Sequence, residues 1–148
     1  MTYAYDKCYL EKAQTALGRM LDYVVYDLAY DLTEFFNLFI STGTAEDFGK
    51  GDFTLIVGKS GVELAWEVLD RAGLSEKRVK PKYTYARSEE YWTGWALAYY
   101  QWFRNLSFSE IICRIPIEEV RGLYYPYHEM DIRQFVDKMD EMYEIRKK

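Results

Sequence analysis

One aromatic segment, YWTGWALAYYQWF at residues 91–103, constrains the fold more than any other part of the chain, because it places seven aromatic rings within thirteen residues. A membrane-spanning helix needs about 20 apolar residues, and this shorter run is flanked by charged residues at both ends. In a helix, rings at three- and four-residue spacing fall on one continuous stripe. This stripe consists of Trp92, Trp95, Tyr99 and Trp102. We therefore predict a central core helix that is apolar around most of its circumference, with these four rings facing the core.

Helical signals also dominate the rest of the sequence. The spacing of a capping box, in which an N-cap side chain and an acid three residues later satisfy free backbone N–H groups, occurs at Asp31, Ser60 and Ser107. Each is followed by apolar residues at helical spacing. Only Thr54–Val57 has the character of a strand, and residues 74–87 are expected to form a long exposed loop.

The predicted fold is an all-α, single-domain bundle of about six or seven helices over residues 1–148, arranged around the aromatic helix. A chain of this length can bury roughly 68–70% of the surface that its unfolded form exposes, so it needs no disulfide or metal to fold. The first helix is expected from Asp6 to Tyr30, and Asp131 is expected to start the last one. Neither a cofactor nor a metal is predicted.

The two cysteines and the start of the chain bear on location. Cys8 and Cys113 are far apart in the sequence and have no metal-binding spacing, so we predict reduced core thiols and leave a single bridge open. Met1–Tyr9 lacks a basic start followed by an apolar run, which indicates no signal peptide. A cytoplasmic protein is the default expectation.

Charge and tyrosine content indicate how the protein interacts. The net charge of −5 is concentrated in residues 1–48, which hold eight acidic and three basic side chains. This excess disfavours general nucleic-acid binding, which needs a basic face. The fifteen tyrosines fit either the rim of a core or an interface. The predicted acidic, tyrosine-rich binding face consists of Tyr23, Tyr26, Asp27 and Tyr30.

Two segments are candidates for nucleic-acid contact. The first is a basic loop with Lys77, Arg78, Lys80, Lys82 and Arg87. The second is residues 107–124, where a short helix, a turn and a second helix have the order of a helix-turn-helix. The second helix begins with Glu118 and Glu119, however, which DNA phosphates would repel.

Signals of catalysis are weak. The only histidine, His128, stands near Glu129 and Asp131, a trio that could perform acid–base chemistry or hold a divalent metal weakly. A turn and a helix cap explain the same residues. The segment LIVGKSG at residues 55–61 has the end of a phosphate-binding loop, but Phe53 stands where that loop needs glycine.

Several segments resemble a family of small, mostly uncharacterised bacterial proteins. They are LGRMLDYVVYDLAYDLTEFFNLFISTG, GKSGVELAWEVL, SEEYWTGWALAYYQWF, SFSEI and YHEMDIRQFV, and they cover nearly the whole chain. Members of this family are often encoded beside short helix-turn-helix regulators, in arrangements like toxin–antitoxin or mobile-element operons. The resemblance implies a small cytosolic protein with a protein partner, and it transfers no catalytic residue.

These observations give one leading hypothesis and two alternatives. The first is a non-catalytic protein-interaction module, a component of a toxin–antitoxin-like pair, whose acidic first helices bind a protein partner. The second is a DNA-associated transcriptional regulator that uses the basic loop, with nucleic acid as the less favoured partner. The third is a small enzyme centred on His128. No membrane contact is expected, and a homo-oligomer stays open.

Overall fold

The computed structural model describes residues 2–74, 78–82 and 87–146, and within them the chain is all-helical, without a strand. These residues form ten α-helices and one short 3-10 helix. Their bounds are η1 Lys7–Tyr9, α1 Leu10–Tyr26, α2 Leu32–Ser41, α3 Thr44–Gly49, α4 Phe53–Ile56, α5 Gly61–Arg71, α6 Glu89–Arg104, α7 Phe108–Arg114, α8 Ile117–Gly122, α9 Tyr124–Tyr127 and α10 Ile132–Ile145.

The helix count exceeds the six or seven predicted because single helical turns form in segments that were assigned otherwise. The strand-like run Thr54–Val57 lies largely in α4, which starts because the Asp52 side chain accepts the Thr54 backbone N–H at 3.0 Å. The segment predicted as a turn after Leu123 contains α9. A local cap can therefore outweigh the strand preference of a short β-branched run.

Capping side chains start the longer helices as the sequence predicts. Ser60 and Ser107 each form a complete capping box, at the starts of α5 and α7. Asp131 caps α10 by accepting the Arg133 backbone N–H at 2.9 Å. The first helix begins later than predicted because Asp6 caps the 3-10 turn η1 instead of α1.

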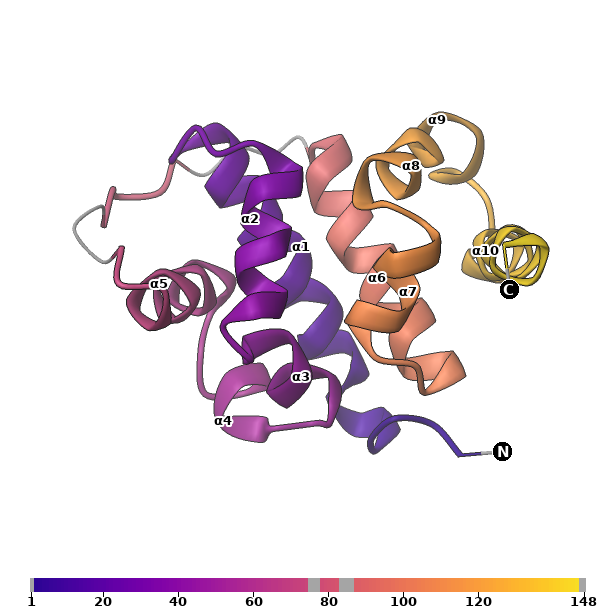
Figure 1. Cartoon of the computed structure of the whole chain (residues 1–148), viewed down its shortest axis with the longest axis horizontal. Coiled ribbons are helices and arrows are strands. Elements are labelled where there is room, and N and C mark those ends of the chain that lie inside the picture. The colour runs from indigo at the N-terminus through magenta and orange to yellow at the C-terminus, as the bar shows by residue number, and fades with distance from the viewer. Residues whose placement is uncertain (1, 75–77, 83–86, 147–148) are drawn as a thin grey trace.

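The two longest helices, α1 and α6, pack with their backbones in close approach. A Cβ atom at Gly94 would lie 2.5 Å from the Leu17 carbonyl oxygen, and one at Gly18 would lie 2.7 Å from the Tyr91 carbonyl oxygen. Glycine is therefore required at both positions for this contact. α1 makes its most extensive contacts with α6 and its next most extensive with α5. Figure 1 shows α5, α1 and α6 arranged side by side, with α10 on the outer side of α6.

The predicted aromatic stripe of α6 is divided between the core and its margin. Trp92 and Trp102 are buried, with 8% and 2% of their surface exposed. Trp95 and Tyr99 are only partly buried, so they do not face the core as fully as predicted. The face of α6 that meets α1 is centred on Gly94 instead, because large rings would hold the two backbones apart.

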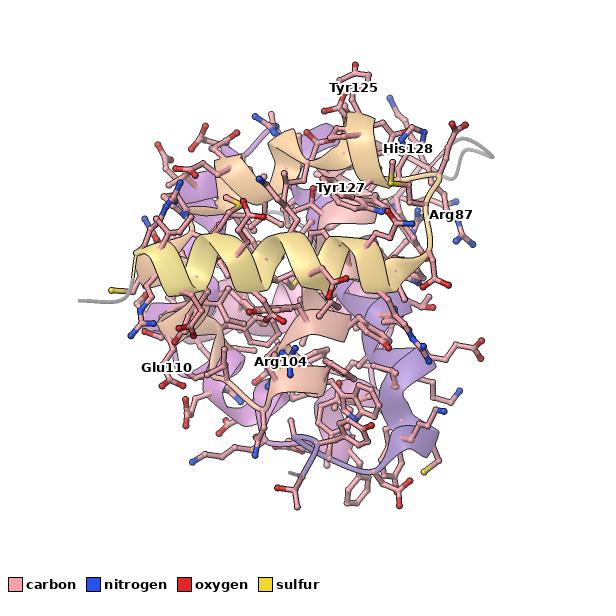
Figure 2. The ribbon with its side chains drawn as sticks, turned by 90° about the vertical axis from the view of Figure 1, so that its right-hand side faces the viewer. Arg87, Arg104, Glu110, Tyr125, Tyr127 and His128 are labelled. Carbon is pink, nitrogen blue, oxygen red and sulfur yellow. The ribbon has the colours of Figure 1, made fainter. Side chains whose placement is uncertain are left out.

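Aromatic packing joins the remaining helices to this pair. Edge-to-face contacts connect the rings of Phe36, Phe39 and Phe108 at centroid distances of 5.3–6.1 Å. On the other side, α10 crosses α6, where Arg104 donates its Nε–H to Asp140 at 3.0 Å. In Figure 2, α10 runs across the front of the molecule and Arg104 lies beside it.

Both cysteines differ from the prediction. Cys8 and Cys113 are exposed and free, whereas core thiols were expected. Cys8 lies in the short η1, which buries none of its residues, and Cys113 lies on the outward face of α7. Within the described part of the chain, no helix combines the length and the apolar character needed to span a membrane.

Candidate interaction surfaces

The structure separates the four residues predicted to form one acidic, tyrosine-rich face. Tyr23 is fully buried, its hydroxyl donates to the Val79 carbonyl oxygen, and it accepts the Trp66 indole N–H at 3.1 Å. Its side chain thus belongs to the interior. Tyr30 is half-buried and packs edge-on against Phe35 at 5.8 Å.

Tyr26 remains at the surface, where it joins three residues from α6 and α9. Its ring is 61% exposed, and its hydroxyl donates to Glu90 at 2.8 Å. Tyr125 of α9 is 74% exposed, and its interaction with the Glu89 carboxylate raises the pKa of its hydroxyl. Figure 2 shows Tyr125 pointing away from the body of the molecule. We call Tyr26, Glu89, Glu90 and Tyr125 the acid–tyrosine patch.

Glu90 is the electrostatic centre of the patch. It is buried, and it accepts hydrogen bonds from Tyr26 and from the Arg121 guanidinium, the latter at 2.7 Å. The hydrogen bond to Glu90 raises the pKa of Tyr26 to about 12, because it stabilises the protonated phenol next to a negative charge. The interaction with Glu89 likewise raises the pKa of Tyr125. Both exposed tyrosines are thus held in the neutral form.

Part of the predicted basic loop is tied to α5. Lys77 lies outside the described residues. Arg78 pairs with Asp70 at 2.7 Å, and its guanidinium lies 5.1 Å from the centroid of the Trp66 ring. The Arg78 charge is therefore already compensated within the chain.

The remaining basic residues of this segment occupy different environments. Lys80 and Lys82 are exposed, and the Lys82 backbone N–H donates to the Asp27 carboxylate at 3.2 Å. Arg87 stands just before α6, with its guanidinium 4.7 Å from the centroid of the Tyr91 ring. The four described residues of the predicted basic loop therefore lie in different environments.

A groove of about 690 Å³ lies between α1, the loop before α5 and the middle of α6. Four cationic side chains line it, and they are Lys12, Arg19, Lys59 and Arg87. Trp95, Ile56 and Val57 give it an apolar wall, and Glu11 and Glu63 are its two acids. We call this site the basic groove.

The GKSG segment lines the basic groove, but not as a phosphate-binding loop. A helix precedes it instead of a strand, and the Ser60 hydroxyl accepts the Glu63 backbone N–H at 3.2 Å. The Glu63 carboxylate in turn accepts the Ser60 N–H at 2.9 Å. Ser60 therefore caps α5, as the alternative interpretation of the sequence proposed.

Cations in the groove are only loosely compensated. Neither Lys12 nor Arg87 has a carboxylate oxygen within 4.0 Å among the described residues. Lys59 reaches Glu67 only at 3.7 Å, and Arg19 has among its partners Asp22 at 3.8 Å.

Several cations elsewhere in the protein are held more closely, although some others, such as Lys7 and Arg133, also lack a carboxylate oxygen within 4.0 Å among the described residues. Arg71 pairs with Glu67 at 2.8 Å, and Arg146 pairs with Glu119 at 2.7 Å. The groove therefore presents positive charge that the chain itself leaves largely available, although the net charge of the protein is −5.

The three candidate catalytic residues have separate structural contacts. The His128 ring stacks on Tyr124 at 4.0 Å, and its Nδ1 lies 2.7 Å from the Tyr124 carbonyl oxygen. Its Nε2 is 3.9 Å from Glu129, whose side chain points into solvent. Asp131 is engaged as the cap of α10. No group of three or more His, Cys, Asp or Glu side chains in the described ranges has the arrangement of a metal site.

The helix-turn-helix order at residues 107–124 is present as α7 and α8, but α8 has only six residues. Glu118 at its start pairs with Arg121, and Glu119 pairs with Arg146. Its first turn thus presents two carboxylates and no cation that could meet a phosphate.

Comparisons of the chain with protein-family models, curated proteins and solved structures find no match. The resemblance to a toxin–antitoxin-like family therefore stays a prediction. Function has to be argued from the two surfaces, the acid–tyrosine patch and the basic groove.

Proposed function

We propose that the protein is a non-catalytic protein-interaction module, a component of a toxin–antitoxin-like pair, and that its acid–tyrosine patch binds a basic segment of the partner protein. One observation carries this proposal. Tyr26 and Tyr125 are more than half exposed, yet the Tyr26 hydroxyl donates to Glu90 and the Tyr125 hydroxyl interacts with the Glu89 carboxylate, both at the start of α6.

Those interactions favour binding by ordering the rings in advance. Association costs roughly 0.5–1.5 kcal/mol for each side chain that it immobilises. Tyr26 and Tyr125 are already oriented by Glu90 and Glu89, so less of this cost remains. Tyrosine also supplies a large amphipathic contact area, and for this reason it is enriched at interfaces.

Charge indicates the chemistry of the partner. Besides its two glutamates, the patch borders Asp22, which accepts the Ser88 hydroxyl at 2.5 Å. Asp22, Glu89 and Glu90 all act on Tyr26 as negative charges, so the patch has a negative field. Such a field attracts a basic surface and raises the association rate. A partner arginine could in addition stack on an exposed tyrosine ring.

Neither alternative gains comparable support from the contacts described. Arg78 of the basic loop is already paired with Asp70, which lowers its value for phosphate contact. His128 faces a backbone carbonyl oxygen and an exposed glutamate, neither of which places a nucleophile or a substrate beside it. The interaction module is therefore the favoured function.

The test is a calorimetric titration of this protein with the purified protein encoded by the adjacent gene. Replacing Tyr26 and Tyr125 together by alanine should weaken binding by about 100-fold or more, because central interface tyrosines typically contribute about 2 kcal/mol or more each. Tyr3→Ala is the matched control, since Tyr3 is also exposed but lies on Trp102, outside the patch.

Two results would contradict the proposal. The first is that the double variant binds the partner as tightly as wild type, whereas Tyr3→Ala binds it more weakly. The second concerns the toxin–antitoxin-like role. One of the two proteins, expressed alone, should arrest growth, and co-expression of the other should relieve the arrest only when the patch is intact. Growth that neither protein affects would refute that role.

A further inference from the structure

We propose that the basic groove is a second binding site, and that it takes an acidic peptide segment with apolar residues between its carboxylates. The site shares no residue with the acid–tyrosine patch. It therefore goes beyond the proposed function, and either one can fail while the other holds.

Incomplete charge compensation is the first argument. Lys12 and Arg87 are exposed and have no carboxylate oxygen within 4.0 Å among the described residues, while Lys59 has only a long contact to Glu67. Together with Arg19 they make four cationic side chains around one groove that contains only two acids. Opposite charge from a ligand would complete these pairs and would also steer its approach.

The spacing of the cations is the second argument. Lys12 and Arg19 stand seven residues apart on α1, and therefore on one face at about 10 Å along the helix axis. Carboxylates on alternate residues of an extended peptide lie about 7 Å apart, and those on every fourth residue lie about 13 Å apart. The separation of about 10 Å lies between these two repeats, so a short acidic peptide meets both cations through the reach of their long, flexible side chains.

An apolar wall specifies what lies between the carboxylates. Trp95 is partly buried and lines the groove together with Val57, which is well exposed, and Ile56. A leucine or aromatic side chain of the ligand would cover these surfaces and gain about 25 cal/mol per Å² of apolar area buried. The volume of about 690 Å³ suits a few side chains.

The acids of the groove favour a peptide over a nucleic-acid strand. Glu11 and Glu63 stand among the cations, and Glu63 is fixed there by its hydrogen bond to the Ser60 N–H. A phosphate backbone carries continuous charge and would meet both carboxylates. A peptide can place apolar or neutral residues opposite them.

The experiment measures fluorescence anisotropy of a labelled peptide composed of glutamates with interspersed leucines. The comparison peptide has glutamine in place of every glutamate. Charge reversal at Lys12→Glu together with Arg87→Glu should weaken binding of the acidic peptide by about tenfold, because it removes two attractive pairs and introduces repulsion in their place. Lys138→Glu is the control, since Lys138 lies on α10, outside the groove.

Support requires three results together: the glutamate peptide binds, the glutamine peptide binds at least about tenfold more weakly, and only the groove variant loses affinity. Circular dichroism checks that each variant keeps its fold. Equal binding of both peptides, or loss of affinity in Lys138→Glu alone, would overturn the proposal.

Two further measurements separate this ligand from other occupants. Single-stranded or duplex DNA that binds more tightly than the acidic peptide, and is released by the groove variant, would assign the groove to nucleic acid and overturn the proposal. Sedimentation of the unliganded protein tests a second copy of this chain: a dimer that Lys12→Glu and Arg87→Glu dissociate would overturn it as well. If the wild type and the groove variant are both monomers, and the wild type binds the acidic peptide, the proposal is supported.

Discussion

The helix α1 carries two surfaces of opposite character at its two ends. Near its C-terminal end, Tyr26 joins α6 and α9 in the acid–tyrosine patch, where each charged or polar group already has a partner. Its N-terminal half lines the basic groove, where Lys12 has no carboxylate oxygen within 4.0 Å among the described residues. In the patch, internal pairs order the side chains, whereas in the groove the charge remains available.

This difference predicts different binding behaviour. The negative field of the patch attracts a basic partner, but its paired charges and ordered rings leave a larger share of the affinity to shape and aromatic contact than in the groove. In the groove, the exposed Lys12 and Arg87 have no carboxylate oxygen within 4.0 Å among the described residues, and they act through electrostatic attraction that is screened over about 8–10 Å at physiological ionic strength. Added salt should therefore weaken ligand binding in the groove more than binding at the patch.

The largest expected effect separates a core ring from a groove ring. Trp102 is buried, and its indole N–H donates to the Tyr5 carbonyl oxygen at 2.8 Å. Trp102→Ala should lower the free energy of unfolding by about 3–5 kcal/mol, as is usual for tryptophan in a packed core. Trp95→Ala should lower it by clearly less, because Trp95 is partly buried and lines the basic groove.

Urea denaturation of the two variants measures both values. If Trp95→Ala destabilised the protein as much as Trp102→Ala, Trp95 would have to be assigned to the core, and the groove would lose its apolar wall as a ligand-binding feature.

An intermediate effect tests whether the patch depends on its internal pairs. Glu90→Ala leaves Arg121 with Glu118 alone and removes the acceptor of the Tyr26 hydroxyl. Because Tyr26 and Arg121 are both partly exposed to water, the loss should be near the net value of one or two hydrogen bonds, about 1–2 kcal/mol. The same change at Glu89, which is less buried and contacts the exposed Tyr125, should stay within about 0.5 kcal/mol of wild type.

Thermal unfolding of Glu90→Ala and Glu89→Ala provides the comparison. Equal melting temperatures for the two variants would show that Glu90 does not organise the patch. Calorimetry with the partner should then show no larger loss for Glu90→Ala than for Glu89→Ala.

Local signals in the sequence predicted the helical class and several helix starts. The capping boxes at Ser60 and Ser107 formed as expected, because both partners of each box are close in the chain. The face of α6 that packs in the core was predicted less well. Ring spacing indicated a stripe through Trp95, but the closest contact with α1 required Gly94, and no spacing rule identifies where two backbones meet.

The two candidate binding surfaces were harder to predict than the helices, because tertiary contacts bring their residues together. The patch combines Tyr26 with Glu90 and Tyr125, which are distant in sequence, so only the fold brings them together. Tyr23 was assigned to the binding face, but it lies on the side of α1 that packs in the core. One signal for the groove was present locally, since Lys12 and Arg19 share a helix face. The loop and Trp95 that complete the groove had no such signal.

The smallest expected effect concerns the ionisation of Tyr26. Its hydrogen bond to Glu90 raises its pKa to about 12, compared with about 10 for an unperturbed tyrosine. Folding therefore favours the protonated phenol, and this stabilising contribution is fully present below about pH 10 and is lost as the pH rises from about 10 to about 12. Because the ring is largely exposed, the change in overall stability should be small, and the pKa itself is the better observable.

The measurement is an NMR titration of ring-labelled tyrosines, with the Tyr26 signal assigned by its absence in Tyr26→Phe. In Glu90→Ala the pKa of Tyr26 should fall toward its ordinary value, because the largest cause of the shift is removed. Glu118→Ala is the control, since Glu118 pairs with Arg121 and makes no described contact with Tyr26. A Tyr26 pKa that both variants leave unchanged would mean that the ring is not held by Glu90, and the ordered patch would then have the same loose electrostatics as the groove.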